Sequence, residues 1–342
     1  MASFAGCAPF DSAQGDTGLA QNDTGLAQGD TGLALSLTNA RRAVPTVRRS
    51  GRSSWVRAIA KNAELLYASD EGRGEVDIYL YARPNKELVG RLAGFDIPSG
   101  ECSDGAGNVY VTDFIAADVL EFARGGSTPK KTLSVKGEPI GCSIDPTTGN
   151  LAVSAFEGAE RRTGSGGVWI FPNAKGKPTL YADAELQEYW SPGYDNKGNL
   201  FVEGEKPNSP TLDELPRGGG SFEEIALSGA TITSPGGVMW DGAYVAAGDQ
   251  EYQGGLSTAI YRVRISGSTG NVVRTTQLTD ACNASGATDV VQPWVEGTEV
   301  VGGDISCSLR FDYWNYARGG APTKSIHANI APEFGSGQTI SR

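Results

Sequence analysis

The chain has 342 residues with 29 basic and 40 acidic side chains, so its formal net charge is −11. This acidic balance excludes nucleic acid as an expected partner, because a negative protein repels the phosphate backbone. No apolar run reaches the roughly 18 residues of a membrane-spanning helix, so we expect no transmembrane segment. Glycine is in excess, with 47 copies and no collagen period, which favours an all-β protein with many tight turns.

The first 57 residues do not have the composition of a folded domain. The pentapeptide Asp-Thr-Gly-Leu-Ala occurs three times between Asp16 and Ala34, and each copy offers one large apolar side chain. This is too little apolar surface to offset the entropy of ordering the chain. An arginine-rich stretch without acids follows, from Arg41 to Arg57. We predict a disordered leader over 1–57, either a solvated linker or an electrostatic contact with an anionic envelope or partner.

The segment Phe4-Ala5-Gly6-Cys7 resembles the lipobox of bacterial lipoproteins, in which the cysteine is acylated. The charged start and the long apolar stretch that precede a lipobox are missing from the sequence. Two interpretations stay open: Cys7 is a lipidation site, or the Ala-Gly-Cys run arises by chance.

From residue 64 onward, four kinds of short segment recur at a spacing of about 40 to 50 residues. They are a Pro-x-Gly strand ending in Asp, a glycine turn with a β-branched strand, an aromatic strand, and a polar strand. Examples are, in that order, 98–104, 107–111, 120–126 and 131–135, with 222–227 as the polar strand of the fourth unit. Four strands in each of six units predict a six-bladed β-propeller of four-stranded antiparallel blades over 58–342.

The two ends of this region also match each other. The first unit lacks a Pro-x-Gly strand, and an additional strand, 338–341, follows the sixth unit. We predict that the C-terminal strand joins the N-terminal blade at its inner edge. This would close the ring and remove an open sheet edge.

The stretch from Pro98 to Asp113 resembles the NHL repeat, which combines Pro-x-Gly, Asp-x-x-Gly-Asn, an aromatic strand and Asp. The stretch 141–153 is similar to a group of exported bacterial NHL-like propellers. The resemblance covers roughly residues 60–342 and implies a propeller and export. It implies no activity, since the repeated residues build turns. Regucalcin-like gluconolactonases and streptogramin lyases share the architecture, but the Glu-Gly-Pro strand of the former and the histidines of the latter are missing here.

In a propeller, the turns that enter inner strands and the turns that leave second strands share one face. The sequence places carboxylates and aromatic rings there, and we expect them to form the ligand-binding face: Glu101, Asp113, Tyr189, Trp190, Glu203, Asp249, Tyr252 and Asp304. Oxygen-rich rings suit Ca²⁺, so the candidate metal ligands are Asp70, Asp113, Glu203 and Asp304. Two alternatives remain open: each Asp accepts backbone N–H groups in its own turn, and the aromatic residues belong to the core.

The cysteines indicate the redox conditions of the compartment in which the protein folds. Cys102 and Cys142 fall in the inner strands of adjacent blades, and Cys282 and Cys307 flank the junction of blades 5 and 6. Their even number and placement predict two disulfides in an oxidising compartment. The alternative is four buried thiols that act as small hydrophobic groups.

These observations favour an exported propeller that binds a small molecule, glycan or protein at its loop face, without catalysis. It would be periplasmic, envelope-attached or secreted, with the leader as a lipid or electrostatic tether. The alternative is a Ca²⁺-dependent lactonase-type hydrolase that uses the carboxylates at the tunnel mouth. A third interpretation is an envelope component that acts through its outer blade surface.

Overall fold

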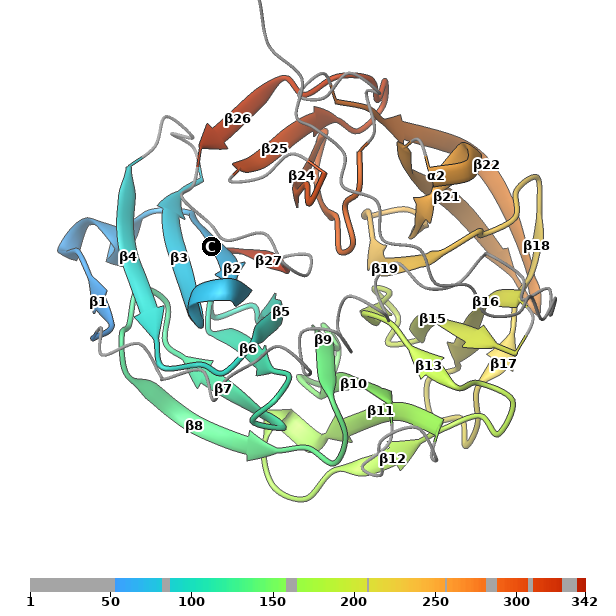
Figure 1. The fold of residues 1–342 in the computed structure, drawn as a ribbon. Coiled ribbons are helices and arrows are strands. Elements are labelled where there is room, and N and C mark those ends of the chain that lie inside the picture. The colour runs from blue at the N-terminus through green and yellow to red at the C-terminus, as the bar shows by residue number, and fades with distance from the viewer. Residues whose placement is uncertain are drawn as a thin grey trace, which may run out of the picture.

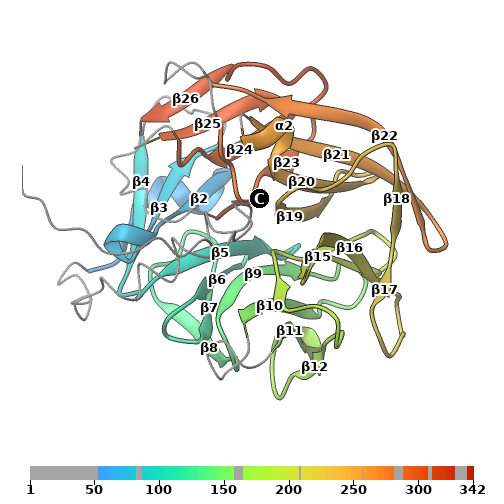
Figure 2. The ribbon, with the colours of Figure 1, turned by 45° about the vertical axis from the view of Figure 1, so that its right-hand side comes forward.

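Six β-sheets stand in a ring around a central axis in the computed structural model (Figure 1). The structure describes residues 53–81, 87–157, 165–207, 209–255, 257–280, 288–306, 310–327 and 337–342. A second view shows how the sheets follow one another around the ring (Figure 2). The predicted six-bladed β-propeller is therefore confirmed. No helix in these ranges is long and apolar enough to cross a membrane.

Blades 2 and 3 follow chain order outward from the axis, whereas blade 1 has the C-terminal strand at its inner edge and the first strand at its outer edge. Blade 1 contains β27 (Gln338–Ser341), β2 (Leu65–Asp70), β3 (Glu75–Leu80), β4 (Leu88–Ala93) and β1 (Trp55–Val56). Blade 2 contains β5 (Pro98–Ser103), β6 (Val109–Asp113), β7 (Asp118–Phe122) and β8 (Pro129–Ser134). Blade 3 contains β9 (Pro139–Ile144), β10 (Leu151–Glu157), β11 (Ser165–Phe171) and β12 (Thr179–Tyr181). β27 pairs antiparallel with β2, and β1 lies inside the predicted leader.

The other three blades are less regular. Blade 4 has a divided inner strand, β13 (Glu188–Tyr189) and β14 (Gly193–Tyr194), followed by β15 (Leu200–Lys206), β16 (Ser209–Leu215) and β17 (Glu223–Glu224). Blade 5 contains β19 (Pro235–Trp240), β20 (Val245–Glu251), β21 (Ser257–Ser266), β22 (Thr269–Leu278) and β18 (Ala226–Ser228). Blade 6 contains β23 (Trp294–Glu296), β24 (Glu299–Gly303), β25 (Arg310–Asn315) and β26 (Lys324–His327). Short helical turns are η1 (Ala58–Asn62), η2 (Glu71–Arg73), η3 (Pro172–Ala174) and α2 (Tyr252–Gly255).

The segment 222–227 differs from its prediction as the single outer strand of blade 4. β17 pairs with β16 of blade 4, whereas β18 pairs in parallel with β22 of blade 5. Ile225, between them, is 3% exposed and packs with apolar residues of both blades. Burial of this side chain gives the physical reason for the split, because one segment then covers the junction of two blades.

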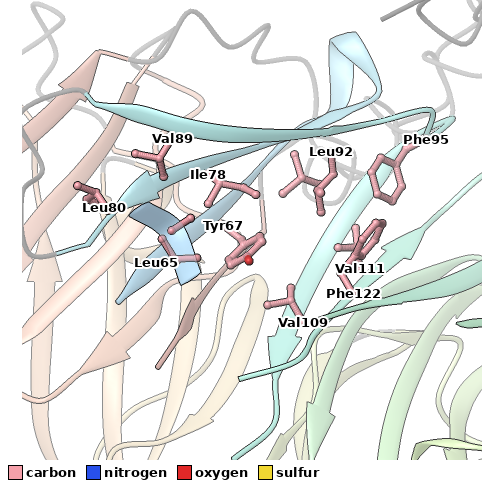
Figure 3. Packing of buried hydrophobic residues seen from close by; sticks show 12 residues of the cluster. Leu65, Tyr67, Ile78, Leu80, Val89, Leu92, Phe95, Val109, Val111 and Phe122 are labelled. Atoms are coloured by element: carbon pink, nitrogen blue, oxygen red, sulfur yellow. The ribbon is translucent and has the colours of Figure 1, made fainter. Parts of the chain in front are cut away.

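Apolar side chains hold neighbouring blades together. Figure 3 shows Leu65, Tyr67 and Ile78 of blade 1 facing Val109 and other residues of blade 2 in one buried cluster. The hydroxyl of Tyr67 also accepts a hydrogen bond of 3.0 Å from the backbone N–H of Gly125 in blade 2. The strand alternation therefore supplies apolar surface on both faces of each blade, as a ring of stacked sheets requires.

Glycines allow the inner strands to meet near the axis. A Cβ on Gly100 of β5 would overlap the carbonyl oxygen of Ile140 in β9. A Cβ on Gly193 of β14 would overlap the carbonyl oxygen of Val238 in β19. Glycine is therefore required in the inner strand because the backbone of the next blade occupies the space that a side chain would need.

We expect Gly100→Ala to lower the free energy of unfolding by about 1–3 kcal/mol, because the added methyl group overpacks two backbones. Urea unfolding followed by far-UV circular dichroism would measure the change. The matched control is Gly105→Ala, since a Cβ on this exposed turn residue meets nothing within 4 Å. Equal midpoints for the two variants would contradict the close-approach argument.

Candidate functional site

A central channel with a cavity of about 230 Å³ follows the axis of the propeller. Glu101, Gln292 and Gln338 line one end of it. The lining then reaches Trp240 and Glu296, the last residues of their inner strands. The channel therefore opens on the face where the inner strands end, which is opposite to the predicted ligand-binding face.

Packed apolar side chains occupy the centre of the predicted face. They come from segments next to the starts of inner strands and the ends of second strands: Ile97, Phe114, Ile140, Phe156, Trp190 and Val291. The rings of Phe156 and Trp190 meet edge to face, with 5.2 Å between their centroids. Its members come from blades 2, 3, 4 and 6, so among the described residues the cluster spans the axis, and we call this end of the channel the closed end.

Glu101 is the one predicted ligand-binding residue that lines the channel. Its side chain lies in β5 and is 5% exposed. Oε1 accepts a hydrogen bond of 2.5 Å from the hydroxyl of Ser69 in blade 1, whereas Oε2 is buried with no partner among the described residues. Burial raises the pKa of this carboxyl to about 8, and the hydrogen bond from Ser69 offsets part of that rise.

Three predicted aspartates accept hydrogen bonds from backbone segments of their own blades. Asp113 accepts from the N–H groups of Asp96 and Ile97 at 2.8 and 2.9 Å. Asp249 accepts from Thr233 and Ser234 at 3.1 Å each, and Asp304 accepts from Asp289 at 3.0 Å. At one repeat position, each aspartate thus anchors the segment that leads into the inner strand.

Asp70 and Glu203 are also fully buried, but they have different partners. Asp70 accepts from the N–H of Arg73 at 3.2 Å and forms an ion pair with the same residue at 3.1 Å. Oε2 of Glu203 accepts from the N–H of Gly236 in blade 5 at 2.6 Å, and Oε1 has no partner among the described residues. Burial raises the pKa of Glu203 well above its usual value, and the charge of Asp249 adds to the rise.

The predicted aromatic residues lie mainly in packed clusters. Tyr189 is fully buried and packs on Phe222, with 6.1 Å between ring centroids. Trp190 belongs to the apolar cluster at the closed end, and Tyr252 is half-buried beside Tyr261, with 6.3 Å between centroids. The structure places none of Tyr189, Trp190 and Tyr252 in the channel wall.

The candidate metal ligands do not gather at one point. Among the described residues, only Asp280, Asp304 and Asp312 place three potential ligand atoms within 4.8 Å of one another. Asp304 is shared with the prediction, whereas Asp70, Asp113 and Glu203 are not part of this group. Asp280 follows the outer strand β22 and Asp312 lies in the third strand β25, so a search of the turns at inner and second strands could not find them.

A disulfide joins two adjacent blades in the channel wall. It links Cys102 of β5 to Cys142 of β9, and the two Cα atoms are 5.6 Å apart. Both residues line the channel. Cys7, Cys282 and Cys307 lie outside the described residues.

The site predicted from the sequence did not include most of the residues that line the channel. Tyr194, Trp294, Gln292 and Gln338 line the cavity and come from the inner strands or the segments beside them. Gln338 donates from Nε2 to the carbonyl oxygen of Gln292, which ties β27 to the start of blade 6. Their position on inner strands was the available signal, because only inner strands face the axis.

A second cavity, of about 570 Å³, lies between blades 4 and 5. Phe201 and Glu214 of blade 4 and Tyr244 and Arg264 of blade 5 contribute to its walls. Trp240, the last residue of β19, is half-buried and lines both this cavity and the channel.

No protein-family model and no curated protein matches the chain. Solved structures do match over 82% of it. A chain of the nidogen/laminin complex has a TM-score of 0.58 and 12% identity, with 99% of that chain covered. A protein of unknown function from Bacteroides caccae has a TM-score of 0.56 and 12% identity, with 100% covered. These similarities establish the class, a β-propeller, and at this identity they show the fold alone.

Proposed function

We propose that this propeller is a non-catalytic binding protein whose central channel holds a small organic cation. The main support is the acidic character of the channel: among the described residues that line it, Glu101 and Glu296 carry carboxyl groups, and none is basic. The indole rings of Trp240 and Trp294 in the wall add faces that attract cations. A volume of about 230 Å³ suits a molecule smaller than a drug-sized ligand.

The channel lacks the groups that nucleophilic catalysis needs. Ser103, Ser143 and Ser191 line it, but its described lining contains no histidine or lysine that could act as a base. The lactonase-type alternative requires a metal that a substrate can reach. The described three-carboxylate group is buried and contributes nothing to the channel wall, so we favour binding over hydrolysis.

Export is part of the same proposal. The disulfide between Cys102 and Cys142 suits an oxidising compartment. Lipidation at Cys7, or contact of the arginine-rich leader with an anionic surface, would tether the propeller to an envelope. A similar propeller in the nidogen/laminin complex supports the use of this architecture as a binding scaffold.

Isothermal titration calorimetry of the full chain at pH 8.5 would test the ligand class. The probes are choline and a short primary amine as cations, glucose as a neutral polyol, and acetate as an anion. We expect heat and quenching of tryptophan fluorescence with the cations alone. Equal binding of glucose or acetate, or no binding of either cation, would refute the proposed function.

A further inference from the structure

Three buried carboxylates meet at the junction of blades 5 and 6. Asp280 follows β22, Asp304 follows β24, and Asp312 lies in β25. One oxygen of each lies within 4.8 Å of the others, and the residues are 6, 2 and 0% exposed. The group therefore joins two blades and is withdrawn from water.

The positive charge beside this group is smaller than the negative charge of its three carboxylates. Arg310 pairs with Asp280 and, at 2.8 Å, with Asp312. Asp304 takes part in none of the ion pairs among the described residues. One guanidinium thus faces three carboxylates, and a buried surplus of negative charge is costly unless a cation or proton balances it.

Asp304 supplies an independent sign of a missing partner. Its Oδ1 accepts from the N–H of Asp289 at 3.0 Å and from the N–H and hydroxyl of Ser306 at 2.9 and 2.6 Å. Its Oδ2 is buried and has no hydrogen-bond partner among the described residues. Since Oδ1 has three donors, Oδ2 is the oxygen left to bind something else.

We propose that Asp280, Asp304 and Asp312 bind one Ca²⁺ that fastens blade 5 to blade 6. Ca²⁺ lies about 2.3–2.6 Å from its oxygen ligands, so two ligands on opposite sides are about 5 Å apart. The observed limit of 4.8 Å fits that spacing with little movement of the backbone. Mg²⁺ demands shorter distances and near-ideal octahedral geometry, which three carboxylates of two blades supply less readily.

This ion has a structural role and is separate from the proposed ligand channel. None of the three carboxylates lines either described cavity. The proposed Ca²⁺ site and the proposed function can therefore be refuted independently, because the first is tested by binding of Ca²⁺ and the second by binding of organic cations.

Thermal unfolding of the chelator-treated full chain, with and without Ca²⁺, would test the site. We expect the midpoint to rise by at least about 4 °C at 100-fold saturation. Asp304→Asn keeps the shape of the side chain and should abolish the rise. The matched control is Asp249→Asn, which changes the same repeat position in blade 5 and should keep the full response.

Tb³⁺ luminescence on the wild-type chain gives a second readout that needs no variant to fold. Trp314 lies two residues from Asp312, and its Nε1 donates to the carbonyl oxygen of Thr279 at 3.1 Å, so it can sensitise the ion. We expect one Tb³⁺ per chain, displaced by Ca²⁺ and lost in Asp304→Asn. No midpoint shift at about 10 mM Ca²⁺, above the range of weak extracellular sites, would overturn the proposal. An equal shift in Asp304→Asn would overturn it as well.

Discussion

Deletion of residues 337–342 should destroy the cooperative unfolding of the propeller. These residues carry β27, which pairs with β2 through four residue pairs and places Ile340 in the core at 4% exposure. The N–H of Gly337 donates to the carbonyl oxygen of Ser99 in blade 2 at 3.0 Å. The hydroxyl of Ser341 donates to the carbonyl oxygen of Gly107, also in blade 2, at 2.6 Å. The strand β27 thus belongs to blade 1 and also bonds to the adjacent blade 2.

The expected loss is large in comparison with the stability of a domain. Each net backbone hydrogen bond contributes about 0.5–1.5 kcal/mol, and burial of an isoleucine about 1.5–3 kcal/mol. Several such bonds together with Ile340 exceed about 5 kcal/mol, the lower end of the usual free energy of unfolding. The deletion also exposes the edge of β2, which favours aggregation.

Far-UV circular dichroism with urea titration would measure this effect. Arg342→Ala is the control, since this terminal side chain is exposed and removing it leaves all four strand pairs of β27 in place. A permuted chain that carries 337–342 ahead of residue 64 should regain the transition. If the deleted chain unfolds at the midpoint of the full chain, β27 does not hold the ring together.

The strand pattern predicted the fold because the relevant signals are local. Each Gly-Asn or Asp-Gly turn specifies a hairpin by itself, as at Gly107 and Gly149, both of which have positive φ. Six such units leave few arrangements other than a ring. The function of the glycine in Pro-x-Gly was not predictable, because the clash at Gly100 involves Ile140, in the next blade.

The site was less predictable because it depends on contacts between blades. The repeat position of Asp113 and Asp249 indicated a shared face, but it left open whether their oxygens face a ligand or accept backbone N–H groups, as they do in the structure. The closed end of the channel depends on Phe156 and Trp190 meeting across blades 3 and 4. Spacing along the chain does not encode such a meeting, so the opening could be located only in the folded structure.

Glu101 should make both stability and ligand binding depend on pH. Its pKa is raised to about 8, above that of the unfolded chain, mainly by burial. Between the two values the folded chain keeps a proton that the unfolded chain loses, so the free energy of unfolding falls as the pH rises. The slope from this one group is at most about 1.4 kcal/mol per pH unit. Glu203 acts in the same direction, so Glu101→Gln should remove only part of the slope.

Binding of an organic cation should have the opposite dependence on pH. The cation favours the ionised carboxylate, so its binding releases a proton, and affinity should rise about tenfold per pH unit up to about 8 and then level off. In Glu101→Gln this slope should vanish, and affinity at pH 8.5 should fall about 100-fold, or about 2.7 kcal/mol. Calorimetric titrations from pH 6 to 9 would measure both.

The control is Glu296→Gln, because Glu296 lines the open end of the channel in an ion pair with Arg342. This substitution should alter the affinity without altering its dependence on pH. Retention of the slope in Glu101→Gln would show that the proton released on binding comes from another group.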